Sequence, residues 1–169
     1  MEFINSTKNI KYFRTLNRRN FEPITPEMDE DIDSWLAFPS SPAMTLVTIN
    51  NVNIEVIDIA TLKPYIWLND VVINTVLYLI TCDTPTSFYL NTHFIGAYQH
   101  QGYDRVRRWT KRIDPGNTGE LFSKRMLFIP IHAAGGSHWA LVAINMVEKT
   151  ITYYCSKKWS AEVILKSSI

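Results

Sequence analysis

HWALVAIN at residues 138–145, followed by TITYYC at residues 150–155, is the stretch of sequence that decides the fold. Both runs are apolar and rich in β-branched and aromatic residues, so we predict two antiparallel strands joined by a short turn. Side chains alternate between the faces of a strand, so a turn with an even number of residues places His138 and Cys155 on the same face. Trp139 follows the histidine directly. A histidine at the rim of a sheet, with an aromatic wall beside it, suits a catalytic imidazole.

Upstream of these strands, the sequence predicts one more strand and a core helix. MLFIPIH at residues 126–132 is an apolar run of strand length, and a loop of small residues follows at 133–137. In WLNDVVINTVLYLIT, which begins at Trp67, either Asn69 or Asp70 can cap the start of a helix. The apolar stripe of this helix consists of residues at helical spacing, namely Val72, Ile73, Val76, Leu77 and Ile80.

The first half of the chain predicts a short helix and two extended runs. Thr25, followed by a proline, is a typical N-cap, and it predicts a helix over residues 26–37. The β-branched runs at 44–49 and 52–59 predict two short strands, or one strand and an extended loop. In the second run the alternation of apolar and polar residues slips at Ile57, so the strand ends or bulges there.

The remaining segments carry weaker patterns. Residues 91–98 predict a helix or an extended segment, and residues 103–110 predict a second helix. A turn is predicted at 114–117, where aspartate, proline, glycine and asparagine follow one another. Residues 161–169 can begin a helix. Residues 1–22 are polar and basic, and we interpret them as an N-terminal arm.

The composition fits one globular domain over residues 23–169, because 46% of the 169 residues are hydrophobic and a chain of this length buries a sizeable core. The net charge of +1 argues against nucleic acid or an anionic membrane as a partner. No apolar run approaches the roughly 18 residues of a membrane span, and no secretory signal is expected. The two cysteines have no disulfide-framework spacing, which favours a nuclear or cytoplasmic protein.

Four motifs in this order resemble the ubiquitin-like-protein-specific cysteine proteases, which are the SUMO- or sentrin-specific proteases. They are WLND at 67–70, GYDRVRRWTKR at 102–112, FIPIH at 128–132 and HWALVAIN at 138–145. The resemblance implies an α+β, papain-like cysteine protease fold and a Cys–His–Asp triad. The implied partner is SUMO or a related modifier, which the family cleaves after its C-terminal diglycine through thiolate attack, an acyl-enzyme and hydrolysis. We expect no cofactor.

The resemblance also assigns the base and the walls of the tail-binding tunnel. His138 matches the general base of the family, although a lone histidine at a strand end is usually structural. Trp67 and Trp139 match the two tryptophans that line the tunnel for the diglycine, whereas such residues are ordinarily core aromatics. Two flat rings leave room for glycine and exclude larger residues. We expect no metal, because His132, His138 and Cys155 match no closed zinc-ligand pattern.

Four further residues are predicted to contact the modifier. Asn69 and Asp70 lie where the family contacts the body of the modifier, and Asp70 is equally well explained as a helix cap. Arg108 and Trp109 belong to a basic-aromatic segment that is either scaffold or modifier contact. The surrounding arginines and lysines otherwise form a solvated face, and a nucleic-acid patch there is not expected.

The chain departs from the family pattern at two points. Cys155 stands between Tyr154 and Ser156, where the family has the aspartate that orients the histidine. A neutral thiol has no charge with which to stabilise an imidazolium. The nucleophilic cysteine of the family lies further along, and no matching segment occurs up to Ile169. We therefore expect a partial catalytic domain, incomplete at the C-terminus, in a chain that is inactive as given.

Neither cysteine of the chain is expected to replace the nucleophile. Cys82 follows a helical stripe, and we interpret it as a structural thiol or a helix-end residue. Cys155 would face the histidine from the side away from the substrate. Two functions stay open: a cysteine-type peptidase or isopeptidase of the family, and a non-catalytic pseudo-protease that binds SUMO without cutting it. A third possibility is that the chain alone does not fold stably, because the absent segment would supply core contacts.

Overall fold

The computed structural model of the chain describes residues 23–37, 44–110, 119–133 and 138–157. These residues belong to two compact units. Of the described residues, those within 9–76 form one unit and those within 77–169 form the other. The predicted N-terminal arm, the turn at 114–117, residues 134–137 of the small-residue loop and the C-terminal tail lie outside the described residues.

The first described element of the unit of residues 9–76 is α2, Pro26–Ala37, which has the bounds that the sequence predicts. The amide of Met28 donates to Oγ1 of Thr25 at 3.3 Å, which confirms the predicted N-cap. Acidic residues fill the first turn, where the partial positive charge of the helix end stabilises them. The helix buries none of its residues completely.

A two-stranded hairpin follows, formed by β1, Thr45–Ile49, and β2, Val52–Glu55. The two residues between the strands are Asn50 and Asn51, with φ of 51° and 61°. Tight hairpin turns need left-handed backbone at both central positions, and asparagine tolerates it better than most residues. The predicted strand pair is therefore confirmed, with a register irregularity between Thr45 and Val47.

The end of the second extended run differs from the prediction, because residues 56–60 form helix α3, Val56–Ala60. Of the two outcomes predicted at Ile57, the end of the strand is right and a bulge is wrong, and the strand already ends at Glu55. The cause is a capping box, in which the Asp58 carboxylate accepts a hydrogen bond from the Glu55 amide at 2.8 Å. This local bonding outweighs the strand preference of the β-branched residues.

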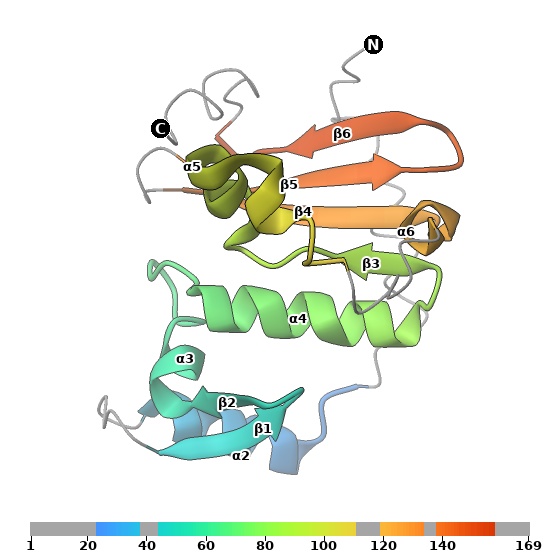
Figure 1. The fold of residues 1–169 in the computed structure, drawn as a ribbon. Helices are drawn as coiled ribbons and strands as arrows, with labels where there is room; N and C mark the ends of the chain where they lie inside the picture. Colours follow the sequence, from blue (N-terminus) through green and yellow to red (C-terminus); the bar gives the residue numbers. More distant parts are fainter. Residues whose placement is uncertain (1–22, 38–43, 111–118, 134–137, 158–169) are drawn as a thin grey trace. The chain divides into compact units, whose positions relative to one another are not determined.

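The predicted core helix is present as α4, Asp70–Asp83 (Figure 1). Its predicted stripe is buried only in part. Val72 is buried and Leu77 is half-buried, whereas Val76 and Ile80 are 48% and 47% exposed. The helix carries apolar side chains around much of its circumference, so a single buried stripe cannot include all of them.

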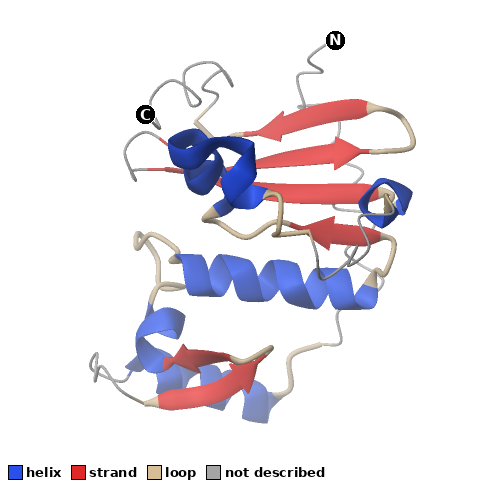
Figure 2. Ribbon diagram, in the orientation of Figure 1, coloured by secondary structure: helices blue, strands red, loops and turns tan. Residues whose placement is uncertain are grey.

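The second unit contains a four-stranded sheet in the order β3-β4-β5-β6 (Figure 2). Its strands are β3, Ser87–Tyr89; β4, Met126–Ala133; β5, His138–Asn145; and β6, Thr150–Tyr154. The pair β3 and β4 is parallel, and the other two pairs are antiparallel. The three long strands confirm the predictions, whereas the sequence analysis missed the short strand β3.

Two helices accompany this sheet. Helix α5, Phe94–Val106, lies over the end of the sheet where β5 begins, and α6, Glu120–Ser123, lies near the start of β4 (Figure 1). Gly102 interrupts α5 with φ 66°, so the two predicted helical segments meet there in one kinked element. The residues packed between α5 and the sheet are Ile95, Ile131, Ala133, Ala140, Val142 and Tyr153.

None of the helices in the described parts of the chain is both long enough and apolar enough to span a lipid bilayer.

Candidate active site

His138 is the first residue of β5 and is 4% exposed. Its strand partner is Ala133 of β4, and the buried residues around that position form an apolar cluster. Burial, and then the positive charge of Lys157, lower the pKa of His138 below its ordinary value of 6.5. The imidazole is therefore held in its neutral form at neutral pH, in which one ring nitrogen accepts a hydrogen bond.

Cys155 contacts this imidazole from the neighbouring strand. Its Sγ atom lies 3.3 Å from Nε2 of His138. The turn between β5 and β6 has four residues, 146–149, and Leu141 pairs with Tyr154. An even turn places both side chains on one face, as the sequence predicts. The structure thus brings together the predicted base and the residue predicted at the position of the orienting aspartate.

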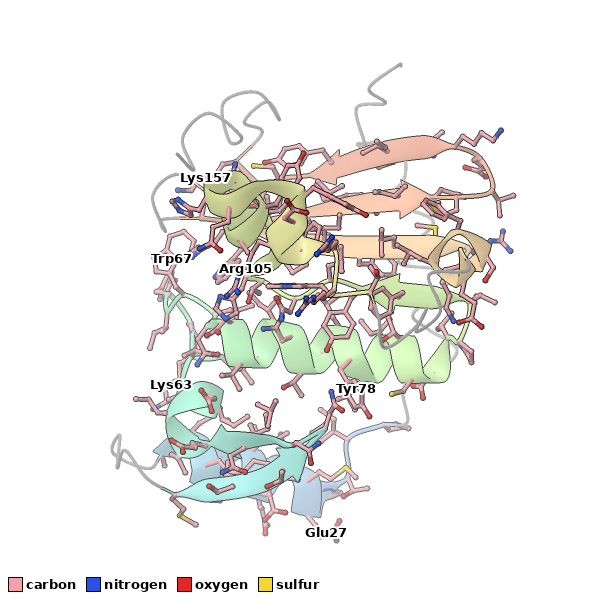
Figure 3. The ribbon with its side chains drawn as sticks, viewed as in Figure 1. Glu27, Lys63, Trp67, Tyr78, Arg105 and Lys157 are labelled. Atoms are coloured by element: carbon pink, nitrogen blue, oxygen red, sulfur yellow. The ribbon has the colours of Figure 1, made fainter. Side chains whose placement is uncertain are left out.

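No carboxylate accompanies this pair on the strands. The sequences of β3, β4, β5 and β6 contain neither aspartate nor glutamate. Lys157 lies just beyond β6 (Figure 3). Its positive charge contributes to the lowered pKa of His138. The electrostatic surroundings therefore disfavour an imidazolium, whereas an orienting aspartate would favour one.

Tyr153 is a neighbour of this pair that sequence reasoning missed. It lies two residues before Cys155 on the same face of β6 and packs on the same apolar cluster. Its hydroxyl oxygen is buried and makes no well-formed hydrogen bond to any described residue. Burial, and then the neighbouring Cys155 thiol, raise the pKa of Tyr153 well above its ordinary value of 10.0. The spacing of two residues from Cys155 was the only signal available in the sequence.

Trp139 and His132 lie on the opposite face of the sheet from His138. They are strand partners, and their rings stack with centroids 4.1 Å apart and planes 11° apart. His132, His138 and Cys155 therefore do not converge. Among the residues that the structure describes, no group of three or more histidine, cysteine, aspartate or glutamate side chains is placed to hold a metal ion.

In the predicted basic-aromatic segment, Trp109 packs against the core and Arg108 faces solvent. Trp109 is half-buried, packs on the core residues Leu90 and Ile129, and meets Phe94 edge to face at 5.8 Å. Arg108 is exposed. Of the two predicted roles, the packing of Trp109 supports scaffold.

The other predicted contact residues belong to the unit of residues 9–76. Trp67 lies just before α4 and is 55% exposed (Figure 3). Asn69 caps that helix, because its Oδ1 accepts the Val72 amide at 3.0 Å. Its Nδ2 also donates to the buried Asp58 carboxylate at 2.6 Å, which ties the start of α4 to α3. Asp70 is the first residue of α4 and is half-buried.

Cys82 lies in the last turn of α4 and is an exposed free thiol. Its place agrees with the predicted helix-end residue. It belongs to a different element from the strands that carry His138 and Cys155.

Known proteins with related sequences give this arrangement a context. Human sentrin-specific protease 3 is 36% identical over 102 residues, which are 60% of this chain and 16% of that protein. Ubiquitin-like-specific protease 1 of Saccharomyces cerevisiae is 34% identical over 132 residues, which are 77% of this chain and 20% of that protein. The chain thus spans at most a fifth of the length of these two relatives.

A solved structure supports the same relationship. The C-terminal Ulp1 protease domain, in complex with Smt3, the yeast ortholog of SUMO, matches with a TM-score of 0.67 and 32% identity. The match covers 78% of this chain and 57% of that domain. The similarity confirms the predicted α+β fold and agrees with its papain-like class. The sequence pattern of the Ulp1 protease family, C-terminal catalytic domain, matches residues 67–157. The chain therefore belongs to the Ulp1 protease family.

Proposed function

We propose that this chain provides the base and the tail-binding residues of a peptidase specific for SUMO or a related ubiquitin-like modifier. The parent activity is cysteine-type peptidase and isopeptidase cleavage after the C-terminal diglycine of the modifier. The observation that carries the proposal is the buried imidazole of His138, which contacts Cys155 just beyond the next strand. The Ulp1 domain with 32% identity, whose structure was solved with Smt3, supports this partner.

In this proposal His138 is the general base and acid. A thiolate attacks the carbonyl carbon of the terminal glycine, and the imidazolium gives its proton to the departing amine. Water then cleaves the thioester. Trp67 and Trp139 match the tail-binding tryptophans of the family, so each is proposed to contact the diglycine, where a flat ring rejects residues with larger side chains. Asn69 and Asp70 contact the body of the modifier, in addition to their place at the start of α4.

The 169-residue polypeptide itself is proposed to bind the modifier with little or no cleavage. Its cysteines are Cys82 and Cys155. Cys82 belongs to the end of α4, and Cys155 contacts Nε2 of His138 in place of a carboxylate. That contact specifically favours the second candidate function, a pseudo-protease that binds SUMO without cutting it. The exposed free thiol of Cys82 supports a reducing nuclear or cytoplasmic location.

Binding to two forms of SUMO tests the proposal. We expect the 169-residue polypeptide to bind SUMO that ends in diglycine at least about tenfold more tightly than SUMO shortened by both glycines, which corresponds to about 1.4 kcal/mol. Trp67→Ala and Trp139→Ala should each remove this difference. Trp35→Ala, the same change in helix α2, is the matched control. Equal affinity for the two forms of SUMO would refute recognition of the tail.

A SUMO vinyl-sulfone probe distinguishes the two candidate functions. Covalent labelling requires a competent thiol, whereas binding does not. We expect binding of the probe without labelling. Labelling of the wild-type polypeptide that is lost in Cys155→Ser would instead make Cys155 a nucleophile and contradict its place as the partner of the histidine.

A further inference from the structure

In the contact between Cys155 and His138, one atom donates the hydrogen bond and the other accepts it, and the position of the hydrogen decides which. With both groups neutral, two arrangements fit the distance of 3.3 Å between Sγ and Nε2. Either the thiol donates to Nε2 and the histidine carries its own hydrogen on Nδ1, or Nε2–H donates to the sulfur. The two arrangements are the two tautomers of the imidazole.

The donor and acceptor strengths of the two groups favour the first arrangement. The unprotonated nitrogen of a neutral imidazole is a good acceptor, whereas a thiol sulfur is a weak one. A third arrangement, a thiolate beside an imidazolium, needs two charges in a site where the imidazole is 4% exposed. Burial and the positive charge of Lys157 both lower the pKa of His138 and so oppose the imidazolium.

We propose that Cys155 donates its Sγ–H to Nε2 and thereby holds His138 in the tautomer that carries hydrogen on Nδ1. Cys155 is then a positioning residue, which acts through the histidine. A carboxylate at this position accepts only, so it would hold the hydrogen on Nε2 and leave Nδ1 as the acceptor. The thiol reverses this arrangement: the hydrogen lies on Nδ1, and the lone pair of Nε2 faces Cys155.

The consequence for catalysis rests on the proposed function, in which His138 is the base. A base must accept a proton at the nitrogen that faces the nucleophile. In the proposed tautomer Nδ1 carries a hydrogen and has no free lone pair, so it cannot accept a proton. The nitrogen that can accept one is Nε2, which faces Cys155. A thiol in place of the carboxylate therefore removes a negative charge. It also changes Nδ1, the nitrogen that would face the nucleophile, from a hydrogen-bond acceptor to a donor.

The acidic and phenolic groups of the sheet strands do not favour the opposite tautomer. The strands of the sheet contain no acidic residue that would accept a hydrogen bond from Nε2–H. Tyr153, on the same face, keeps its phenolic hydrogen at neutral pH, because burial raises its pKa. A neutral phenol brings no negative charge to the pair.

Nitrogen NMR of the 169-residue polypeptide tests the tautomer directly. Long-range correlations between the ring hydrogens and the two ring nitrogens of ¹⁵N-labelled histidine identify which nitrogen is protonated. The chain has four histidines, and the spectrum of His138→Gln identifies the signals of His138. At neutral pH we expect hydrogen on Nδ1. Hydrogen on Nε2, or on both nitrogens, would overturn the proposal.

Three variants separate this role from simple packing. Cys155→Ser keeps a donor and should keep the hydrogen on Nδ1. Cys155→Asp should move it to Nε2 and raise the pKa of His138 by about one unit or more. Cys155→Ala, which removes the sulfur and with it the donor, should lose the preference for Nδ1. An alanine variant with the same tautomer as wild type would refute the role of Cys155.

The spectra need no modifier, so they are independent of the proposed function. Hydrogen on Nε2 in a chain that binds the SUMO tail would refute the tautomer alone. Hydrogen on Nδ1 in a folded chain that ignores the tail would refute the proposed function alone. If Cys155→Asp does not fold, the serine and alanine variants still decide the tautomer.

Discussion

The imidazole of His132 lies flat against the indole of Trp139, across the paired strands β4 and β5. His132 is exposed and Trp139 is half-buried, so the histidine covers one face of the indole and fixes the plane of its ring. The two residues lie on the face of the sheet opposite His138 and Cys155. A change at His132 should therefore reorient Trp139 without disturbing the contact between His138 and Cys155.

Replacement of His132 is predicted to weaken recognition of a SUMO tail. Stacked aromatic pairs contribute about 0.5–1.5 kcal/mol, so we expect His132→Ala to lower the affinity for SUMO with diglycine by about twofold to tenfold. His132→Phe keeps a flat ring against the indole and should retain the affinity. Fluorescence anisotropy with labelled SUMO measures the effect. His100→Ala, at an exposed histidine of α5, is the control. Unchanged affinity in His132→Ala would show that the stack does not position Trp139 for binding.

Acid is predicted to destabilise the fold through His138. Burial and Lys157 lower the pKa of His138 in the folded chain below its ordinary 6.5. As pH falls below about 6.5, the unfolded chain binds a proton that the folded chain does not. The free energy of unfolding therefore decreases until pH reaches the lower pKa of the folded state. Each unit by which the pKa is lowered corresponds to about 1.4 kcal/mol.

Urea unfolding measured from about pH 8 to about pH 5 checks this dependence. His138→Gln should lose the part of the pH dependence that comes from the buried imidazole. His132→Gln, which replaces an exposed histidine, should keep it. The same pH dependence in His138→Gln and wild type would contradict the assignment to His138.

Tyr153→Phe is predicted to leave stability unchanged or to raise it by about 1 kcal/mol. The reason is that the buried hydroxyl has only the Cys155 thiol as a polar neighbour and forms no well-formed hydrogen bond with it, so its desolvation cost is poorly compensated. The raised pKa of Tyr153 also predicts that stability is lost as pH rises above 10.0, where the unfolded tyrosine ionises first. Tyr153→Phe should remove this loss. Denaturant unfolding at neutral and alkaline pH measures both effects, with Tyr154→Phe on the opposite face as the control. A large loss of stability at neutral pH would reveal a hydrogen bond of the hydroxyl.

Three replacements of Asn69 separate its two hydrogen bonds. Asn69→Ala removes the cap of α4 and the bond to the buried Asp58, and we expect a loss of about 2 kcal/mol or more in the free energy of unfolding. Asn69→Ser keeps a cap and loses the bond to Asp58, so its loss should be smaller. Asn69→Asp also keeps a cap but places two carboxylates together, so its stability should improve as pH falls and one of them is protonated. Thermal unfolding at two pH values measures the series, and equal stability of the alanine and serine variants would contradict a role of Asn69 as a cap.

The strands of the candidate site were predictable because their signals are local. The apolar runs at 126–132 and 138–145 have strand length, and an even turn is enough to place His138 and Cys155 on one face. The even number of residues in the turn thus explains why these two side chains can contact each other. The cap of α4 was predictable for the same reason, since Asn69 directly precedes the helix.

The remaining elements depend on interactions that a linear pattern conceals. β3 has three residues and is stabilised by parallel pairing with a strand almost forty positions later. α3 was obscured by its β-branched residues, although Glu55 and Asp58 at capping-box spacing were an available signal. Tyr153 resembled an ordinary strand aromatic. Only its burial beside Cys155 distinguishes it.

Pro130 lies in β4 beyond Phe128, the last residue that pairs with β3. The Leu90 amide donates to the Phe128 carbonyl, so the backbone groups of Phe128, and by alternation those of Pro130, point toward that border of the sheet. Proline has no amide hydrogen, so it costs β4 no bond to β5. Pro130 is also buried, so an ordinary residue here would place an amide hydrogen without a strand partner in the protein interior. Proline ends the pairing at this border without that cost.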